Sequence, residues 1–135
     1  MKYSGGIPLD HFLLYPAIGE QRLHELVDHF YHHVSKHPLL APIFPADLTE
    51  TARKQKLFLT QFFGGPALYS LEFGAPMLRA RHLPFPITPE RAEAWLQCMQ
   101  EAMKEVGLLD EELGRFMLER LTKTAHHMMN TESSL

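Results

Sequence analysis

The chain has 135 residues, with 13 lysines and arginines against 16 acidic residues, and a formal charge of −3 at pH 7. This length is typical of a single domain, and the slightly acidic balance excludes the basic footprint of a nucleic-acid-binding protein. No run approaches the ~18 consecutive apolar residues of a membrane span, so we expect no membrane partner. The single cysteine, Cys98, is typical of a reducing compartment, and we expect a cytoplasmic protein.

The composition favours helices over strands. The chain contains 21 leucines and seven methionines, but only three valines and four isoleucines. Strands are enriched in β-branched residues, whereas helices tolerate Leu and Met better. We therefore predict a single all-α domain over residues 1–135, with a loose N-terminal arm (1–15) and a flexible C-terminal tail (131–135).

The first half of the chain predicts two long helices. Over residues 20–36 apolar positions recur at the helical period and form one stripe. The proline-broken stretch 38–45 then forces an extended or turning path. A second helix is predicted over 47–63, because the spacing from Asp47 to the glutamate three residues later is typical of a helix N-terminus. Gly64-Gly65-Pro66 ends it.

The second half predicts a short helix and two long ones. A loop containing Tyr and Gly precedes a short helix around residues 76–83. Thr88 as cap and Pro89 in the first turn are typical of a helix start, and Gly107 is a natural left-handed end for that helix. Asp110 is expected to cap the last helix.

Four polar or semi-polar side chains lie on predicted helix faces where a simple bundle would have leucine. They are Tyr31, Thr51, Gln55 and Trp95. A buried polar group without a partner costs about 1–3 kcal/mol. Either these groups satisfy one another or the backbone in an ordinary core, or their donors converge from three helices on a pocket for a polar ligand.

His82 is the fifth unusual residue, because prolines follow it at the end of the short helix. A neutral imidazole there can bind a metal through one nitrogen and donate its other N–H to a free backbone carbonyl. Arg79 and Arg81 flank it and are suited to anionic groups. The alternative is a surface histidine beside two solvated arginines.

A second group of histidines lies on the first long helix and consists of His29, His32, His33 and His37. A zinc site needs three or four ligands that converge on one point, and one helix face supplies two well and a third poorly. We interpret this group as a solvated polar face, with a metal site as the alternative.

Several motifs in order resemble those of the group II truncated haemoglobins, over about residues 16–130. These motifs are Phe30-Tyr31, Phe44-Pro45, Phe62-Phe63-Gly64-Gly65-Pro66, Tyr69-Ser70, Leu78-Arg79-Ala80-Arg81-His82-Leu83-Pro84-Phe85 and Ala94-Trp95-Leu96-Gln97-Cys98-Met99. The most specific are the Arg-x-Arg-His-x-Pro-Phe string and the tryptophan that follows its histidine at the family's spacing.

The resemblance implies a two-over-two helical sandwich around haem b, with His82 as the proximal iron ligand. It implies that Tyr31, Gln55 and Trp95 hydrogen-bond a ligand on the distal side, and that Thr51 occupies the distal-gate position. The residues it assigns to haem contact are Phe44, Phe58, Phe62, Tyr69, Leu78, Arg81, His82, Phe85, Trp95 and Met99.

The function implied by the resemblance is reversible O2 binding, for transport or storage, with NO and CO as further ligands. A reductase and a second copy of the chain are the candidate partners. The first alternative is an enzyme that uses the same haem for NO dioxygenation or peroxide reduction, although no histidine or carboxylate occupies the distal positions for peroxidase acid–base work. The second alternative is a cofactor-free helical interaction module.

Overall fold

The computed structural model describes residues 3–4, 7–8 and 14–133. Its helices are α2 (Leu14–Ile18), α3 (Glu20–Lys36), α4 (Thr49–Phe62), α5 (Leu68–Phe73), α6 (Leu78–His82), α7 (Pro89–Glu105) and α8 (Glu112–Met128), with a 3-10 turn, η1 (Ala41–Ile43). The only strands among the described residues are β1 (Tyr3–Ser4) and β2 (Ile7–Pro8), which pair antiparallel. The prediction of an all-α fold is confirmed.

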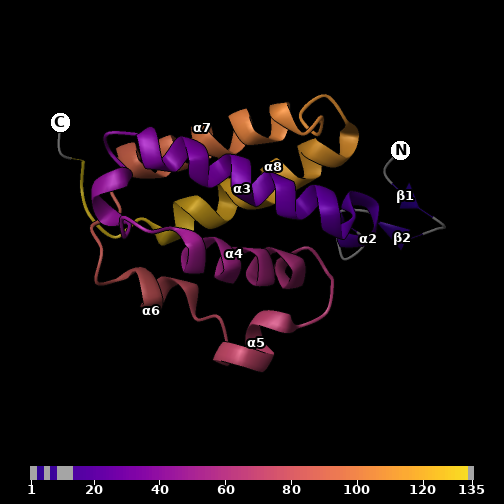
Figure 1. The fold of residues 1–135 in the computed structure, drawn as a ribbon, viewed down its shortest axis with the longest axis horizontal. Helices are drawn as coiled ribbons and strands as arrows, with labels where there is room; N and C mark the ends of the chain where they lie inside the picture. The colour runs from indigo at the N-terminus through magenta and orange to yellow at the C-terminus, as the bar shows by residue number, and fades with distance from the viewer. Residues whose placement is uncertain (1–2, 5–6, 9–13, 134–135) are drawn as a thin grey trace.

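The four long helices form two packed pairs. Helix α3 packs against both α4 and α7, and α7 packs against α8. Figure 1 shows α3 beside α7, with α4 along the other edge of α3 and the short helices α5 and α6 outside α4. The core between the layers contains the fully buried side chains of Leu23, Leu26, Phe30, Met99, Met103 and Met117. This arrangement is the predicted two-over-two sandwich.

The ends of the long helices follow from local sequence. Helix α3 spans the predicted residues, and its apolar stripe is the buried face. Helix α7 begins at Pro89 because the Thr88 hydroxyl accepts a hydrogen bond from the Arg91 N–H at 3.1 Å. Gly107, with φ near +78°, takes the left-handed conformation that ends this segment. The Asp47 carboxylate accepts from the Thr49 N–H at 3.0 Å, and α4 begins at Thr49 after Leu48, two residues later than the predicted start.

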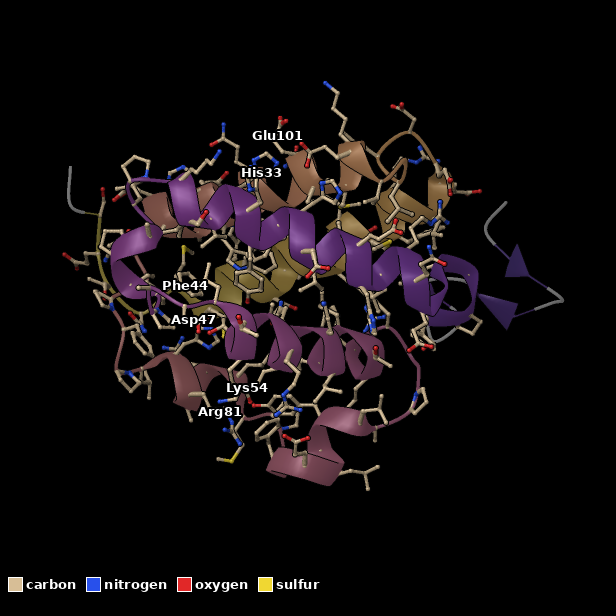
Figure 2. The ribbon with its side chains drawn as sticks, viewed as in Figure 1. His33, Phe44, Asp47, Lys54, Arg81 and Glu101 are labelled. Atoms are coloured by element: carbon tan, nitrogen blue, oxygen red, sulfur yellow. The ribbon has the colours of Figure 1, made fainter. Side chains whose placement is uncertain are left out.

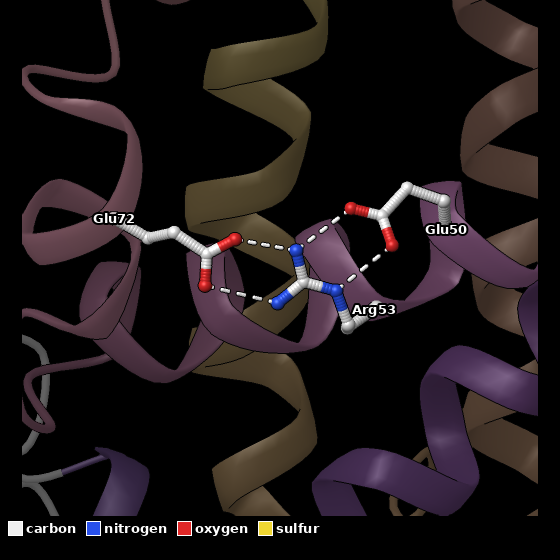
Figure 3. A network of polar contacts seen from close by, with 3 residues as sticks. All are labelled: Glu50, Arg53 and Glu72. Carbon is white, nitrogen blue, oxygen red and sulfur yellow. Dashed lines mark hydrogen bonds and ion pairs between the residues drawn. The ribbon is translucent and has the colours of Figure 1, made fainter.

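Two further details differ from the prediction. Helix α8 begins at Glu112 with Glu111 as its cap, one residue beyond the expected Asp110. The predicted loop after α4 contains helix α5. This helix has only six residues, which is too few for a helical period to be recognised in the sequence. Arg53 of α4 holds this helix by pairing with Glu72 as well as with Glu50 of its own helix (Figure 3).

The predicted ends of the chain are only partly described. Most of the arm predicted over 1–15 lies outside the described residues, although Leu14 is fully buried and begins α2. In the predicted tail, the Thr131 N–H donates to the Ile87 carbonyl and the Ser133 hydroxyl bonds Glu90, while 134–135 lie outside the description. None of the helices described is long and apolar enough to cross a membrane.

Candidate functional site

A cavity of about 550 Å³ lies between α3, α4, α6, α7 and α8. This volume is in the range of small-molecule and cofactor sites. The structure brings together nearly every residue that the sequence assigned to the site. The predicted residues that line the cavity are Tyr31, Phe44, Thr51, Gln55, Phe58, Phe62, Tyr69, Leu78, Arg81, His82, Phe85 and Trp95.

Met99 is the predicted site residue that the structure does not bring to this cavity. Its side chain is fully buried in the core of α7, and it is absent from the cavity lining. Met99 lies on the same face of α7 as Trp95 but one turn further along the helix, where it packs in the core cluster.

His82 is oriented by a backbone carbonyl. Its Nδ1 lies 2.7 Å from the carbonyl oxygen of Leu78, one turn earlier in α6. A carbonyl can only accept, so Nδ1 carries the proton, and the neutral ring has its lone pair on Nε2. Nε2 has no hydrogen-bond partner among the described residues. This tautomer leaves Nε2 available to bind a metal.

Three hydrogen-bond donors from other helices face the same cavity: Tyr31 of α3, Gln55 of α4 and Trp95 of α7. In the described part of the chain none of these three side chains has a hydrogen-bond partner in the protein. The only buried polar side-chain atom without a hydrogen-bond partner there is Nη1 of Arg120. The donors are therefore open to the cavity and not satisfied within an ordinary core. Burial raises the pKa of Tyr31 well above its usual value, so its phenol stays protonated.

Packing fixes the directions of two of these donors. The fully buried Phe30 ring makes edge contacts with Tyr31 and Trp95, at centroid distances of 4.9 and 5.1 Å. Phe44 contacts the other side of Tyr31 at 5.9 Å. Rings in edge-to-face contact resist rotation, because each has little free space and a preferred geometry. The donors are thus held in place before any ligand binds.

The rim of the cavity is cationic. Lys54, Arg81 and Arg91 belong to its lining, which contains no aspartate or glutamate. Figure 2 labels two of these cations, Lys54 on α4 and Arg81 on α6. Backbone carbonyls hold Arg81, which donates from Nε to Pro76 at 2.7 Å. A net acidic chain that gathers cations here is suited to a ligand with carboxylates.

Sequence reasoning missed part of the lining, namely Leu40, Ile43, Pro45, Lys54, Leu59, Ile87, Arg91, Ala92, Leu121, Thr124, Ala125 and Met128. Several of these, such as Leu121, Ala125 and Met128, recur at the helical period on one face of α8. Periodicity shows which face of a helix is inward, but it does not distinguish a face that packs on protein from one that borders a cavity.

The structure also places the histidines of α3 and the arginine at position 79. His29 and His33 share one carboxylate oxygen of Glu105, at 3.0 and 2.9 Å, and so join α3 to α7. Within the described residues, no group of three or more His, Cys, Asp and Glu side chains could hold a metal ion. Arg79 does not face the cavity and donates instead to the carbonyls of His127 and Met129.

The features of the cavity fit haem. An imidazole with a free Nε2 can ligate iron, the aromatic and aliphatic lining can contact a flat apolar macrocycle, and the cationic rim can pair with propionates. Donors on the other walls could hydrogen-bond a ligand bound to that iron. These are the properties of a haem-binding globin pocket.

Known proteins agree with this interpretation. A sequence model of the bacterial-like globins matches residues 13–130. The chain is 66% identical over 116 residues to the group 2 truncated haemoglobin YjbI of Bacillus subtilis (strain 168), covering 86% of this chain and 87% of that protein. The structure of the group II truncated haemoglobin from Bacillus anthracis matches with a TM-score of 0.87 at 62% identity, covering 89% of this chain and 98% of that one. The X-ray structure of a truncated oxygen-avid haemoglobin from Bacillus subtilis matches with a TM-score of 0.84 at 65% identity, over 87% and 98%.

The chain therefore belongs to the group II truncated haemoglobins, within the bacterial-like globins. Its cofactor is haem b, and its biochemical role is to bind diatomic ligands through that haem.

Proposed function

We propose that this protein binds O2 reversibly, with His82 as the proximal ligand of the haem iron and Tyr31, Gln55 and Trp95 as hydrogen-bond donors to the ligand. The observation that carries the proposal is the pairing of a tautomer-fixed imidazole with unpartnered donors around one cavity. A relative at 65% identity is described as oxygen-avid, which supports the same ligand here. Ferrous haem supplies an open coordination position for the ligand.

The residues of this chain then do three things. The Leu78 carbonyl holds His82 in the tautomer that binds iron. Phe30 and Phe44 fix the donors, which stabilise partial negative charge on the ligand in a cavity of low dielectric. Lys54, Arg81 and Arg91 of the lining would pair with the haem propionates.

The test is the absorption spectrum of the purified protein and of His82→Ala. We expect a strong Soret band in the parent and loss of stable haem retention in His82→Ala. His127→Ala is the matched control, because its side chain is exposed and its ring does not line this cavity. A His82→Ala protein with full haem and an unchanged ferrous spectrum would refute the ligand assignment. A parent that takes up no haem would favour an interaction module.

Turnover measurements distinguish O2 binding from catalysis. The described cavity lining contains His82 as its only histidine and has no carboxylate that could serve as a distal acid or base. We therefore expect slow peroxide turnover. Fast turnover of NO in the presence of O2 and a reductase would favour NO dioxygenation over O2 storage or transport as the function.

A further inference from the structure

Helix α6, which carries His82, has only five residues and therefore little stability of its own. It begins after Met77, a non-glycine residue in the left-handed conformation, with φ near 43°. Pro84 and Pro86 follow, and neither has an N–H with which to extend a hydrogen-bonded structure. Contacts from elsewhere in the fold must therefore hold the segment in place.

Asn130, two residues beyond the end of α8, supplies most of these contacts. Its Nδ2 donates to the carbonyls of His82 and Phe85, at 3.2 and 3.0 Å. Its Oδ1 accepts from the Ile87 N–H at 2.9 Å, and its own N–H donates to the Ile87 carbonyl at 3.0 Å. One residue thus binds the chain at three points over residues 82–87, and one of them is the peptide group of His82 itself.

Arg79 makes a second attachment at the start of α6. Its Nη1 donates to the carbonyls of His127 and Met129, at 2.9 and 3.0 Å. The last carbonyls of a helix lack partners within the helix and carry the negative end of its dipole, so a guanidinium is well suited to them. Arg79 therefore joins α6 to the same end of α8 that bears Asn130.

The helix that precedes Asn130 is anchored in the core. Helix α8 packs into the core through Met117 and Leu121, both almost fully buried. Leu121, Ala125 and Met128 of this helix also line the cavity. One helix thus contributes a wall of the cavity and fixes the segment that carries the imidazole.

We propose that Asn130 is a positioning residue for His82, and that with Arg79 it makes the C-terminal end of α8 set the orientation of the imidazole toward the haem. The inference rests on the proposed function. Asn130 acts through the backbone of His82 and does not touch the haem position itself: it does not belong to the cavity lining. Loss of an outer partner of a metal ligand typically changes metal affinity by 10–100-fold.

The decisive variant is Asn130→Asp, which retains the acceptor for the Ile87 N–H but replaces the amide N–H donors with an oxygen that repels the His82 and Phe85 carbonyls. The test has two measurements. The first is the iron–histidine stretching band of the ferrous holoprotein by resonance Raman spectroscopy, and the second is the rate of haem release to an apoglobin scavenger. We expect a shifted or broadened band and haem release about tenfold faster. Arg79→Met should give a smaller change in the same direction, and it carries the test if Asn130→Asp does not fold.

The control is again His127→Ala, which removes a side chain from the same end of α8 but retains the carbonyl that Arg79 binds. An unchanged band and release rate in folded Asn130→Asp, or in Arg79→Met if only that variant folds, would overturn the inference. So would an equal change in His127→Ala. A merely structural role would lower thermal stability without moving the band. Failure of the proposed function is separate, because it would remove the iron–histidine band from the parent protein as well.

Discussion

The hydrogen bond from His82 to Leu78 decides which ring nitrogen is free to bind a metal. Tyr31 and Trp95 are a different case. Packing against Phe30 fixes their rings but leaves the O–H and N–H groups without hydrogen-bond partners in the described residues. Donors that open into the cavity are available to a ligand that accepts hydrogen bonds. The residues of this cavity are therefore organised for a polar ligand before it arrives.

Replacing Tyr31 by phenylalanine should speed O2 dissociation about tenfold, and Trp95→Phe should act in the same direction. Each change removes one donor worth about 1–1.5 kcal/mol, and about 1.4 kcal/mol corresponds to a factor of ten in rate. Stopped-flow O2 dissociation measures the effect. Tyr15→Phe is the matched control, because Tyr15 does not line the cavity. Unchanged rates in both distal variants would exclude these side chains as ligand donors.

The raised pKa of Tyr31 predicts a stability loss at alkaline pH. Above the ordinary tyrosine pKa of about 10, the unfolded chain releases this proton whereas the folded chain retains it. The free energy of unfolding should then fall with rising pH, by up to about 1.4 kcal/mol per pH unit from this one group. Guanidinium unfolding between pH 9 and 11 measures it. The fall should be shallower in Tyr31→Phe, and an equal slope in the two proteins would contradict the prediction.

At the scale of the elements, the backbone of Gly114, near the start of α8, lies close to the turn before this helix. A Cβ on Gly114 would lie 1.9 Å from the carbonyl oxygen of Leu108, a fully buried residue. Backbone cannot yield as a side chain can, so α8 must shift away from the turn before it. This contact explains why a glycine is placed near the start of a long helix, where it costs helix propensity.

Gly114→Ala should lower the free energy of unfolding by about 2 kcal/mol, a typical cost of overpacking. Thermal or denaturant unfolding measures it, with the exposed neighbour Arg115→Ala as the control that should change stability by less than about 0.5 kcal/mol. Equal stabilities of Gly114→Ala and the parent protein would show that this turn adapts without cost.

For the whole molecule, the cavity among the helices predicts that haem contributes to stability. A ligand that binds only the folded chain stabilises it by about 2.7 kcal/mol at one hundred times its Kd, which corresponds to about 10 °C for a domain of this size. We expect such a rise in Tm when haem is added to the apoprotein. Protoporphyrin IX without iron should give a smaller rise, because it fills the cavity but cannot bond His82. Equal rises would show that this bond adds nothing.

Much of the fold can be predicted from the sequence, because its signals are local. The stripe of α3, the cap at Thr88 and the glycine at 107 each act within a few residues, so their outcomes follow from neighbours in the chain. Helix α5 could not be predicted in this way. Its six residues depend on Arg53 and Gln61 of α4, which pair with Glu72 and Ser70.

The features of the site also divide into those that the sequence predicts and those that depend on the tertiary structure. The sequence by itself determined the residue types, including an imidazole followed by prolines and polar side chains on inward helix faces. The family resemblance implied the roles that we propose for them. Only the tertiary structure decided that Met99 packs in the core, that Arg79 binds the end of α8 and that α8 lines the cavity. The physical reason is that a helix period specifies a direction, whereas a cavity is specified by what several helices leave unfilled.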